Sequence, residues 1–415
     1  MEITAADTDP ALLLLPWNVP LAQWPEDLVI SLPRGISRNL VRFVAFGRDG
    51  AGTAGSVDGG TVYAVKELPD RLALREYRLL GELRKRDLPV VTSAAVVTGR
   101  VGAGGEPLFG IVLTRHLTFS LPYRALFAAR PAPAEAERLI DALVMLLVRL
   151  HMAGFMWGDC SLSNTLFRRD AGAFEAYLVD AETGELHDAL SRGQREWDIE
   201  LATEKCAGEL MDLQAGGLLT AEDPIALGLS ISDRYRRLWR LVTDELRITD
   251  GQLWRIEERV RAIQQAGFEV GELAMTAAAG DVGRDVVIRP KVVEAGHNSR
   301  RLLRLTGLDV GENQARRLLS DIDAFRSRRP AGATDEATAA AWLVEQYQPL
   351  VRAVPAHLRG RLEAPEVYHE VLEHRWYLCQ QEGRDVPWQE AVARYVAEIL
   401  AHKEDEAVVT PAVAE

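Results

Sequence analysis

Residues 150–182 read LHMAGFMWGDCSLSNTLFRRDAGAFEAYLVDAE, and the polar residues in this stretch decide how the rest of the chain is interpreted. Asp159 is followed five positions later by Asn164 and a short apolar run, and a second apolar run ends at Asp180. A carboxylate, an amide and a second carboxylate in this order are typical of a loop that transfers phosphoryl groups. We therefore expect Asp159 to accept a hydroxyl proton. Asn164 and Asp180 are predicted magnesium ligands, because their oxygens suit a hard cation.

Upstream of this stretch, residues 62–66 read VYAVK, an apolar strand that ends in Lys66. A lysine at the end of such a strand is typical of the residue that contacts the nucleotide phosphates in kinases. The next segment, 71–86, has its leucines and Tyr77 at helical spacing. We expect Glu76 on this helix to be the ion-pair partner of Lys66, with Glu82 as the alternative.

Two loops compete as the cover of the nucleotide phosphates. Residues 47–60 contain six glycines, whereas residues 33–38 join the first two of three strand-like runs, 27–32, 40–46 and 61–68. The order of strands favours 33–38, because the lysine then lies on the third strand. We assign Gly35 and Ser37 to phosphate binding, where backbone N–H groups approach the ligand. Residues 47–60 are expected to form a flexible hairpin insertion.

The adenine end of the site is expected after a buried strand at 108–114. The segment 115–122 is similar to the hinge at which an adenine ring meets the backbone, so Thr114, Arg115 and Leu117 are candidate contacts. We interpret His116 as a structural residue. A long amphipathic helix at 135–152 then leads into the catalytic loop, and its apolar residues are expected to form core.

Composition limits the class of protein. The chain has 415 residues, 47% hydrophobic and 26% charged, which is ordinary for a globular protein with two or three domains. A formal net charge of −13 argues against broad binding to nucleic acid or anionic membrane. Three scattered cysteines form neither a disulfide framework nor a zinc spacing, which favours a reducing compartment. With no signal peptide and no apolar run long enough to span a membrane, we expect a cytoplasmic protein.

Beyond the loop, residues 193–213 predict a helix from which Asp198 braces the catalytic loop, and helices are expected through 231–270. Residues 284–329 hold eleven Lys/Arg against six Asp/Glu. The glycines at 307 and 311 between two apolar helical halves suggest a nucleic-acid-binding hairpin, but a solvated basic face explains the same pattern. A patch of Arg300, Arg301 and Arg304 for an acidic partner is the intermediate interpretation.

The motifs together resemble the protein-kinase-like superfamily. They are Lys66 with Glu76, the LHMAGF run at 150–155, Gly158-Asp159 with Asn164, and Val179-Asp180. A glycine directly before Asp159 is similar to the atypical branches, which include RIO-type kinases, aminoglycoside phosphotransferases and lipopolysaccharide core kinases. The phrases WGDCSLSNTLF, LVDAETGEL and HEVLEHRWYL resemble an uncharacterised bacterial family placed beside the lipopolysaccharide kinases. In two departures, Trp157 stands where many relatives have His, and Ala181-Glu182 replaces Phe-Gly, so a switch at that loop is not implied.

The resemblance implies an α+β, bilobal protein-kinase-like fold with a small antiparallel-sheet N-lobe, a helical C-lobe and a further helical C-terminal domain. It also implies ATP and Mg2+ as cofactors and a hydroxyl acceptor, which the sequence leaves open among a protein Ser/Thr, a sugar and a lipid headgroup. A nucleotide-binding pseudokinase or scaffold, or a nucleic-acid-binding module at 281–330, are the alternatives. The expected organisation is an N-terminal arm at 1–25 packed through Trp17 and Trp24, an N-lobe at 26–115, a C-lobe at 116–280, a helical domain at 281–403 and a disordered tail at 404–415.

Overall fold

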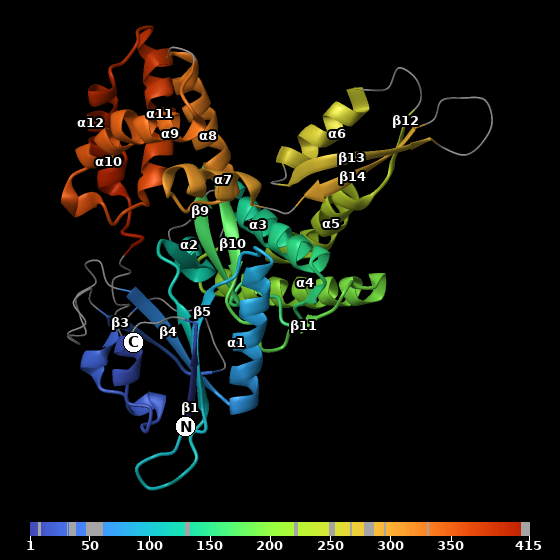
Figure 1. Cartoon of the computed structure of the whole chain (residues 1–415), viewed down its shortest axis with the longest axis vertical. Coiled ribbons are helices and arrows are strands. Elements are labelled where there is room, and N and C mark those ends of the chain that lie inside the picture. The colour runs from blue at the N-terminus through green and yellow to red at the C-terminus, as the bar shows by residue number, and fades with distance from the viewer. Residues whose placement is uncertain are drawn as a thin grey trace. The chain divides into compact units, whose positions relative to one another are not determined.

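A computed structural model describes most of the chain (Figure 1). The described residues are 1–6, 10–30, 32, 39–46, 61–128, 133–219, 223–248, 254–265, 268–277, 286–293, 296–329 and 332–407. Both candidate phosphate loops, 33–38 and 47–60, lie outside these ranges, and so do Gly35 and Ser37. The assignment of those two residues therefore stays a prediction.

The chain packs into two compact units. The first comprises residues 1–167 and 176–232, and the second comprises residues 168–175 and 233–407. The main part of the second unit begins at Asp233, which is earlier in the sequence than the expected boundary near 281. It also includes a short piece taken from within the kinase-like motifs, residues 168–175.

The first unit is built on a six-stranded antiparallel sheet, shown in blue and cyan in Figure 1. The strand order is β1-β5-β6-β4-β3-β2, so β4, which carries Lys66, lies inside the sheet between β6 and β3. Its alternate residues Tyr63 and Val65 are buried in a core that also includes Trp17 and Trp24. The strands are β1 (Glu2–Ala5), β2 (Val29–Ile30), β3 (Val41–Phe46), β4 (Thr61–Leu68), β5 (Thr92–Thr98) and β6 (Gly110–Arg115).

The N-terminal residues differ from the extended arm that the prolines predicted. Residues 2–5 form β1 and pair with β5, and the following segment makes short 3-10 helices. The expected packing through Trp17 and Trp24 is confirmed, since both indoles are buried and meet edge to face at 5.7 Å. The first residues thus complete the sheet, because β1 supplies hydrogen-bonding groups to the outer edge of β5.

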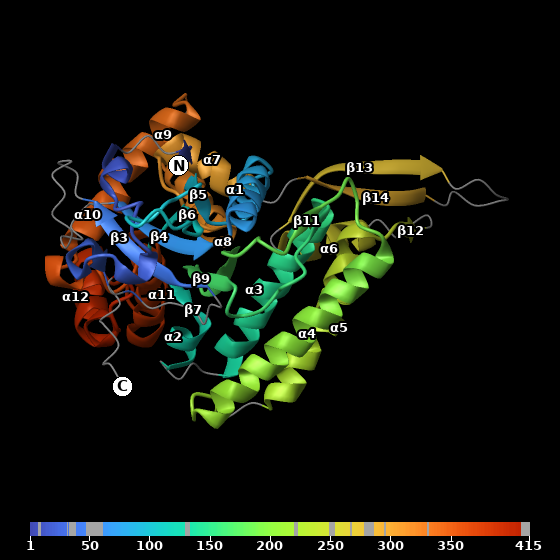
Figure 2. The same ribbon diagram turned by 90° about the horizontal axis from the view of Figure 1, so that it is seen from below.

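Helices and short strands form the rest of the first unit. α3 and α4 lie side by side in both Figure 1 and Figure 2, and the catalytic loop runs between α3 and the strands β9 and β10. α3 contains the uninterrupted apolar residues that the sequence predicted as core. The remaining elements are α1 (Asp70–Lys85), β7 (Ser120–Pro122), α2 (Tyr123–Ala128), α3 (Pro133–Met152), β8 (Phe155–Met156), β9 (Thr165–Asp170), β10 (Ala173–Leu178), β11 (Glu185–Leu186), α4 (Arg192–Ala215) and α5 (Pro224–Thr243), which runs on into the second unit.

The second unit is mostly helical but contains a three-stranded sheet of order β12-β14-β13. β12 interrupts the region 231–270 that was predicted as helical throughout, because Leu246–Ile248 pairs with β14. Its helical part has one core around Trp342, Tyr347 and Tyr368. The elements are β12 (Leu246–Ile248), α6 (Trp254–Gln265), β13 (Glu269–Ala277), β14 (Val286–Val293), α7 (His297–Thr306), α8 (Glu312–Ser327), α9 (Asp335–Trp342), a π-helical turn (Leu343–Tyr347), α10 (Gln348–Ala353), α11 (Ala364–Glu382) and α12 (Trp388–Glu398).

Within the second unit, the turn between β9 and β10 is held by the helices. Asp170 is buried and accepts hydrogen bonds from the N–H groups of Asn313 and Gln314, at 3.1 and 2.7 Å. It thereby caps the start of α8, whose own N-cap residue is a glycine without a side-chain acceptor. The N–H of Ala171 donates to Glu366 at 3.0 Å.

Residues 404–407 also differ from the disordered tail that was expected. Glu406 forms an ion pair with Arg169 at 2.8 Å, and the N–H of Ala407 donates to the carbonyl of Gly360. These contacts fix the last described turn of the chain to the second unit. Among the described residues, no helix is both long and apolar enough to cross a bilayer.

Candidate functional site

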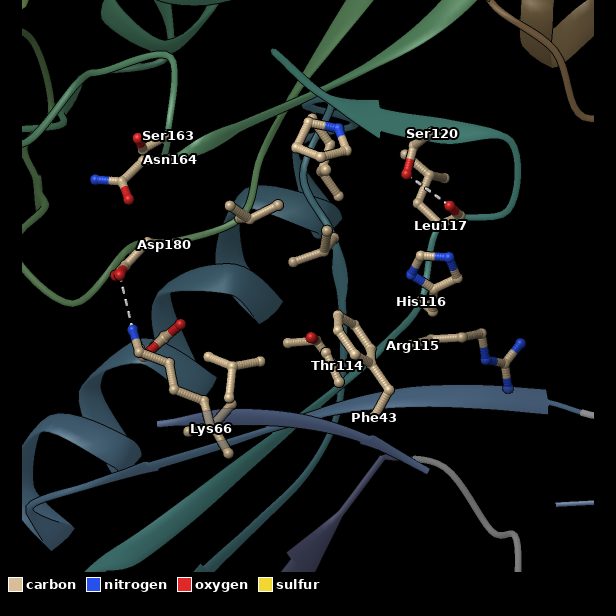
Figure 3. A pocket seen from close by; sticks show the side chains of 18 residues that line it. Phe43, Lys66, Thr114, Arg115, His116, Leu117, Ser120, Ser163, Asn164 and Asp180 are labelled. Carbon is tan, nitrogen blue, oxygen red and sulfur yellow. Dashed lines mark hydrogen bonds and ion pairs between the residues drawn. The ribbon is translucent and has the colours of Figure 1, made fainter. Parts of the chain in front are cut away.

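Lys66 is the centre of a charged cluster (Figure 3). Its ammonium lies 3.0 Å from Glu76 Oε2, 2.8 Å from Asp180 Oδ2 and 3.1 Å from Glu182 Oε2. β4 presents the lysine from the middle of the sheet, and α1 packs beside it and presents Glu76. Asp180 follows β10 directly. The predicted pair of Lys66 with Glu76 is therefore present, and Glu82 pairs with Lys85 instead.

Three carboxylates around one ammonium leave the cluster with an excess of negative charge. Burial lowers the pKa of Lys66, but the attraction of Glu76, Asp180 and Glu182 outweighs it, so the net pKa is raised. Burial raises the pKa of Glu76 to about 8, because the cost of burying its charge, with some repulsion from Asp180 and Glu182, outweighs the attraction of Lys66. Lys66 is thus charged at neutral pH, and Glu76 takes up a proton easily.

Asp159 lies on the catalytic loop five residues before Asn164, is not among the residues that line the cavity described below, and has donors on both carboxylate oxygens. Asn164 Nδ2 donates to its Oδ2 at 3.1 Å and to its backbone carbonyl at 2.9 Å. The ammonium of Lys205 contacts its Oδ1. The amide of Asn164 therefore turns its nitrogen to Asp159, which leaves its oxygen as the atom available to a cation.

The catalytic loop is held from below by α4. Asp198 is fully buried and accepts hydrogen bonds from the N–H groups of Trp157 and Gly158, at 2.7 and 2.8 Å. Glu209 accepts from the N–H groups of Leu162 and Ser163, at 2.7 and 3.0 Å. The brace predicted for Asp198 is confirmed. Glu209, further along α4, supports the loop in the same way.

His151 and Trp157 complete the support of the loop. His151 Nε2 lies 3.0 Å from Asp198 Oδ2, and burial lowers the pKa of this histidine, so it is a neutral packing residue. Trp157 is buried, and its indole N–H donates to the carbonyl of Asp180 at 2.9 Å. The tryptophan that departs from the family pattern therefore ties the two halves of the motif together. Gly158 has φ of +71°, a left-handed conformation that favours glycine just before the catalytic aspartate.

A cavity extends from this cluster to the predicted hinge. Lys66, Asn164 and Asp180 border one end, and Thr114, Arg115 and Leu117 border the other, as Figure 3 shows. All three predicted hinge residues therefore line it. The walls between are apolar and come from the strands and from the catalytic loop side: Val41, Phe43, Ala64, Val112, Leu166 and Val179. An apolar slot with a charged end fits a planar base at one end and phosphates at the other.

His116 and Glu182 also lie at the site. His116 lies within the predicted hinge segment and packs edge to face against Phe43, with ring centroids 5.7 Å apart. Its ring lines the cavity, and burial lowers its pKa to about 4, so it is a neutral packing residue there. Glu182 contacts Lys66 and accepts a hydrogen bond from Asn39 at 3.2 Å. Contacts between distant segments decide the position of Glu182, which no local pattern predicts.

The donor set suits magnesium. Carboxylate oxygens of Glu76, Asp180 and Glu182 lie within 4.8 Å of one another, and the oxygen of Asn164 borders the same cavity. Hard oxygen donors with net negative charge are what Mg2+ prefers, usually through one or two carboxylates together with phosphate oxygens. The predicted ligands Asn164 and Asp180 therefore fit the ion chemically, and Glu182 is a further candidate.

Comparison with known proteins agrees with this arrangement. Residues 61–202 match the lipopolysaccharide kinase (Kdo/WaaP) family, and residues 237–400 match a domain of unknown function (DUF4032). No curated protein matches the chain. A solved structure described as WaaP in complex with acyl carrier protein is similar at 18% identity, with a TM-score of 0.35, over 64% of this chain and 99% of that chain.

The kinase-family match runs from the start of β4 into α4. It therefore includes the lysine strand, the helix with Glu76, the hinge and the whole catalytic loop. The lysine on an inner strand, its glutamate partner and the aspartate after β10 are arranged as the protein-kinase-like fold requires. Residues 61–202 are therefore similar to the lipopolysaccharide kinase (Kdo/WaaP) family, which supports a kinase-like phosphotransferase, and a separate match to the DUF4032 domain follows at residues 237–400.

Proposed function

We propose that the protein transfers the γ-phosphoryl group of ATP, with magnesium, to a hydroxyl on an acceptor. The observation that carries the proposal is the meeting of Lys66 with Asp180 at one end of an apolar cavity whose other end is a hinge of backbone groups. The base of ATP occupies the apolar slot beside Thr114, Arg115 and Leu117. Its phosphates lie against Lys66, and Glu76 keeps the lysine in place.

In the reaction, Asp159 accepts the proton of the acceptor hydroxyl while the hydroxyl oxygen forms a bond to the γ-phosphorus. The bond from that phosphorus to the bridging oxygen of ADP breaks, and its electron pair leaves with ADP. Asn164 and Asp180 hold magnesium, which supplies charge neutralisation for the phosphates when it is bound. Lys66 stabilises charge on the phosphate oxygens, because an ammonium in a partly buried site acts at low effective dielectric.

The acceptor is proposed only by class. A protein serine or threonine, a sugar and a lipid headgroup all present the hydroxyl that Asp159 needs. The three cysteines are free, which suits a cytoplasmic protein with access to ATP.

The proposal is tested by radiolabel transfer from [γ-32P]ATP, with cell extract as the source of acceptor. We expect Mg2+-dependent labelling by the wild type, and a loss of about 100-fold or more in Asp159→Asn, because the base is removed while the shape is kept. Asp212→Asn, which changes an exposed carboxylate on the same helix as the brace, is the matched control and should label normally. Nucleotide binding without any labelling would favour the pseudokinase alternative.

A further inference from the structure

Lys205 is a charged residue that the motifs do not contain. It lies on α4, far from the catalytic loop in sequence, yet its ammonium contacts Oδ1 of Asp159. The other carboxylate oxygen of Asp159 is taken by the amide of Asn164 at 3.1 Å. Each carboxylate oxygen can accept more than one hydrogen bond, so the hydroxyl of an acceptor still has a lone pair to approach.

The register of α4 explains why Lys205 reaches the loop. Asp198, Lys205 and Glu209 are spaced by seven and four residues, which places them on one face of a helix. Asp198 holds the loop just before Asp159, and Glu209 holds it just after. Lys205 therefore lies on α4 between two residues that hydrogen-bond to the loop, and these bonds fix the helix where the Lys205 ammonium contacts Asp159.

A simple structural ion pair does not account for this position. Asp198 and Glu209 already satisfy the N–H groups on both sides of Asp159, so the loop backbone has its supports. The side chains of Lys205 and Asp159 are 29% and 18% exposed, and partly exposed ion pairs contribute at most about 1 kcal/mol to stability. What Lys205 adds is a positive charge beside the group that accepts the proton.

We propose that Lys205 is a positioning residue for phosphoryl transfer, which holds the carboxylate of Asp159 in place for the acceptor hydroxyl. The inference rests on the proposed function. An ionised base beside the negatively charged phosphates is repelled by them, and a nearby ammonium offsets that repulsion. The bonds formed and broken are those of the transfer itself. Lys205 keeps its proton throughout, and the hydroxyl proton goes to Asp159.

The effect on the rate separates this role from a structural one. Removal of Lys205 leaves the carboxylate of Asp159 held on one side only, by the amide of Asn164, so kcat falls while ATP still binds. A lysine with only a structural role would lower the amount of folded enzyme and leave the kcat of the folded enzyme unchanged.

The experiment measures Mg2+-dependent ATP turnover, with water as the acceptor, at one neutral pH and over a range of ATP concentrations. Lys205→Met keeps the length of the side chain without its charge, and Lys205→Arg keeps the charge. We expect Lys205→Met to lower kcat by about 10- to 100-fold, within the range for losing part of a general base. The KM for ATP should change less than about threefold, since Lys205 is not among the residues that line the cavity.

Lys205→Arg keeps the charge beside Asp159 and should restore most of the lost kcat. Lys85→Met, on an exposed lysine paired with Glu82, is the control and should behave as the wild type. Wild-type kcat in Lys205→Met, or a loss of kcat that Lys205→Arg does not restore, would overturn the inference alone. A wild type that turns over no ATP would overturn the proposed function and this inference together.

Discussion

The ammonium of Lys66 donates to Oδ2 of Asp180 over 2.8 Å, although 114 positions separate the two residues in the sequence. The contact joins an inner strand of the sheet to the end of the catalytic loop region. In the proposed function each partner has a different ligand atom to bind: Lys66 takes phosphate oxygens and Asp180 takes magnesium. In the proposed function, the pair thus marks the place where ATP and the metal ion meet.

Replacement of Lys66 tests the charged cluster. We expect Lys66→Met to lower ATP turnover by about 100-fold or more, because the phosphates lose their cation. Stranding a buried carboxylate usually costs about 3–5 kcal/mol, but Glu76 takes up a proton easily, so we expect a loss nearer 1–2 kcal/mol. Urea unfolding measures the loss. Adding Glu76→Gln should recover stability without turnover, and recovery of turnover would contradict the role given to Lys66.

The brace on α4 makes a separate prediction. Asp198 accepts hydrogen bonds from the N–H groups of Trp157 and Gly158. In Asp198→Asn one of these N–H groups faces the amide N–H2 of the new side chain, so a buried donor has no acceptor. Such a loss costs on the order of 2–4 kcal/mol where the acceptor was charged. We expect a lower melting temperature and a lower kcat. Glu200→Gln, on an exposed position of the same helix, is the control. Equal melting temperatures for the two variants would show that the loop is held by other means.

The second unit should respond to pH through two buried carboxyl groups. Burial raises the pKa of Asp170 to about 6 and that of Glu366 to about 7, above the values of 3.8 and 4.5 for the free groups. Their contribution to stability is therefore full below the unfolded pKa and is lost as pH rises through the folded pKa. Each effect is on the order of 2–3 kcal/mol between pH 4 and pH 8.

Asp170→Asn and Glu366→Gln should each flatten this dependence, because the replaced groups no longer titrate. We expect the melting temperature of each variant, relative to the wild type, to rise as pH goes from 5 to 8. Asp321, which accepts hydrogen bonds from Trp342 and Tyr368 in the same unit, is left unchanged in both variants. A constant difference between variant and wild type over this range would show that neither carboxyl titrates as described.

The alternative function, nucleic-acid binding by the α7–α8 hairpin, can be tested separately. Glu312 accepts hydrogen bonds from the N–H groups of Asn298 and Ser299 at the start of α7, and the N–H of Leu308 at the turn donates to Thr306, so these three donors are used within the hairpin. Arg301 pairs with Asp335. We expect no retardation of duplex DNA by the full chain in a gel at low salt. A shift that weakens steeply with salt would support the alternative, because phosphate contacts release counterions.

The parts of the site that the sequence predicted are those with a local signature. Lys66 ends an alternating strand, Glu76 lies on a helix with an apolar stripe, and Asp180 closes an apolar run. Each position is defined by the residues beside it, so the pair of Lys66 with Glu76 could be predicted from periodicity and order. The same holds for the hinge, whose three predicted residues line the cavity.

The parts that escaped prediction depend on contacts between distant segments. Lys205 and Glu209 lie at helical spacing from Asp198, but nothing near them in the sequence indicates which loop they face. Glu182 reads as a loop residue until Lys66 and Asn39 are brought beside it. The segment 2–5 is too short to be predicted as a strand from its own sequence. It forms a strand because it pairs with the edge of β5.

Binding of ATP with and without magnesium tests the central claim most directly. The measurement is the shift in melting temperature on adding ATP, for the wild type and for Asp180→Ala, at equal protein concentration. A ligand that binds the folded state raises the melting temperature in proportion to the logarithm of its concentration over Kd. We predict a magnesium-dependent shift in the wild type that is lost in Asp180→Ala. No magnesium-dependent shift in the wild type, or an equal shift in the variant, would contradict the account.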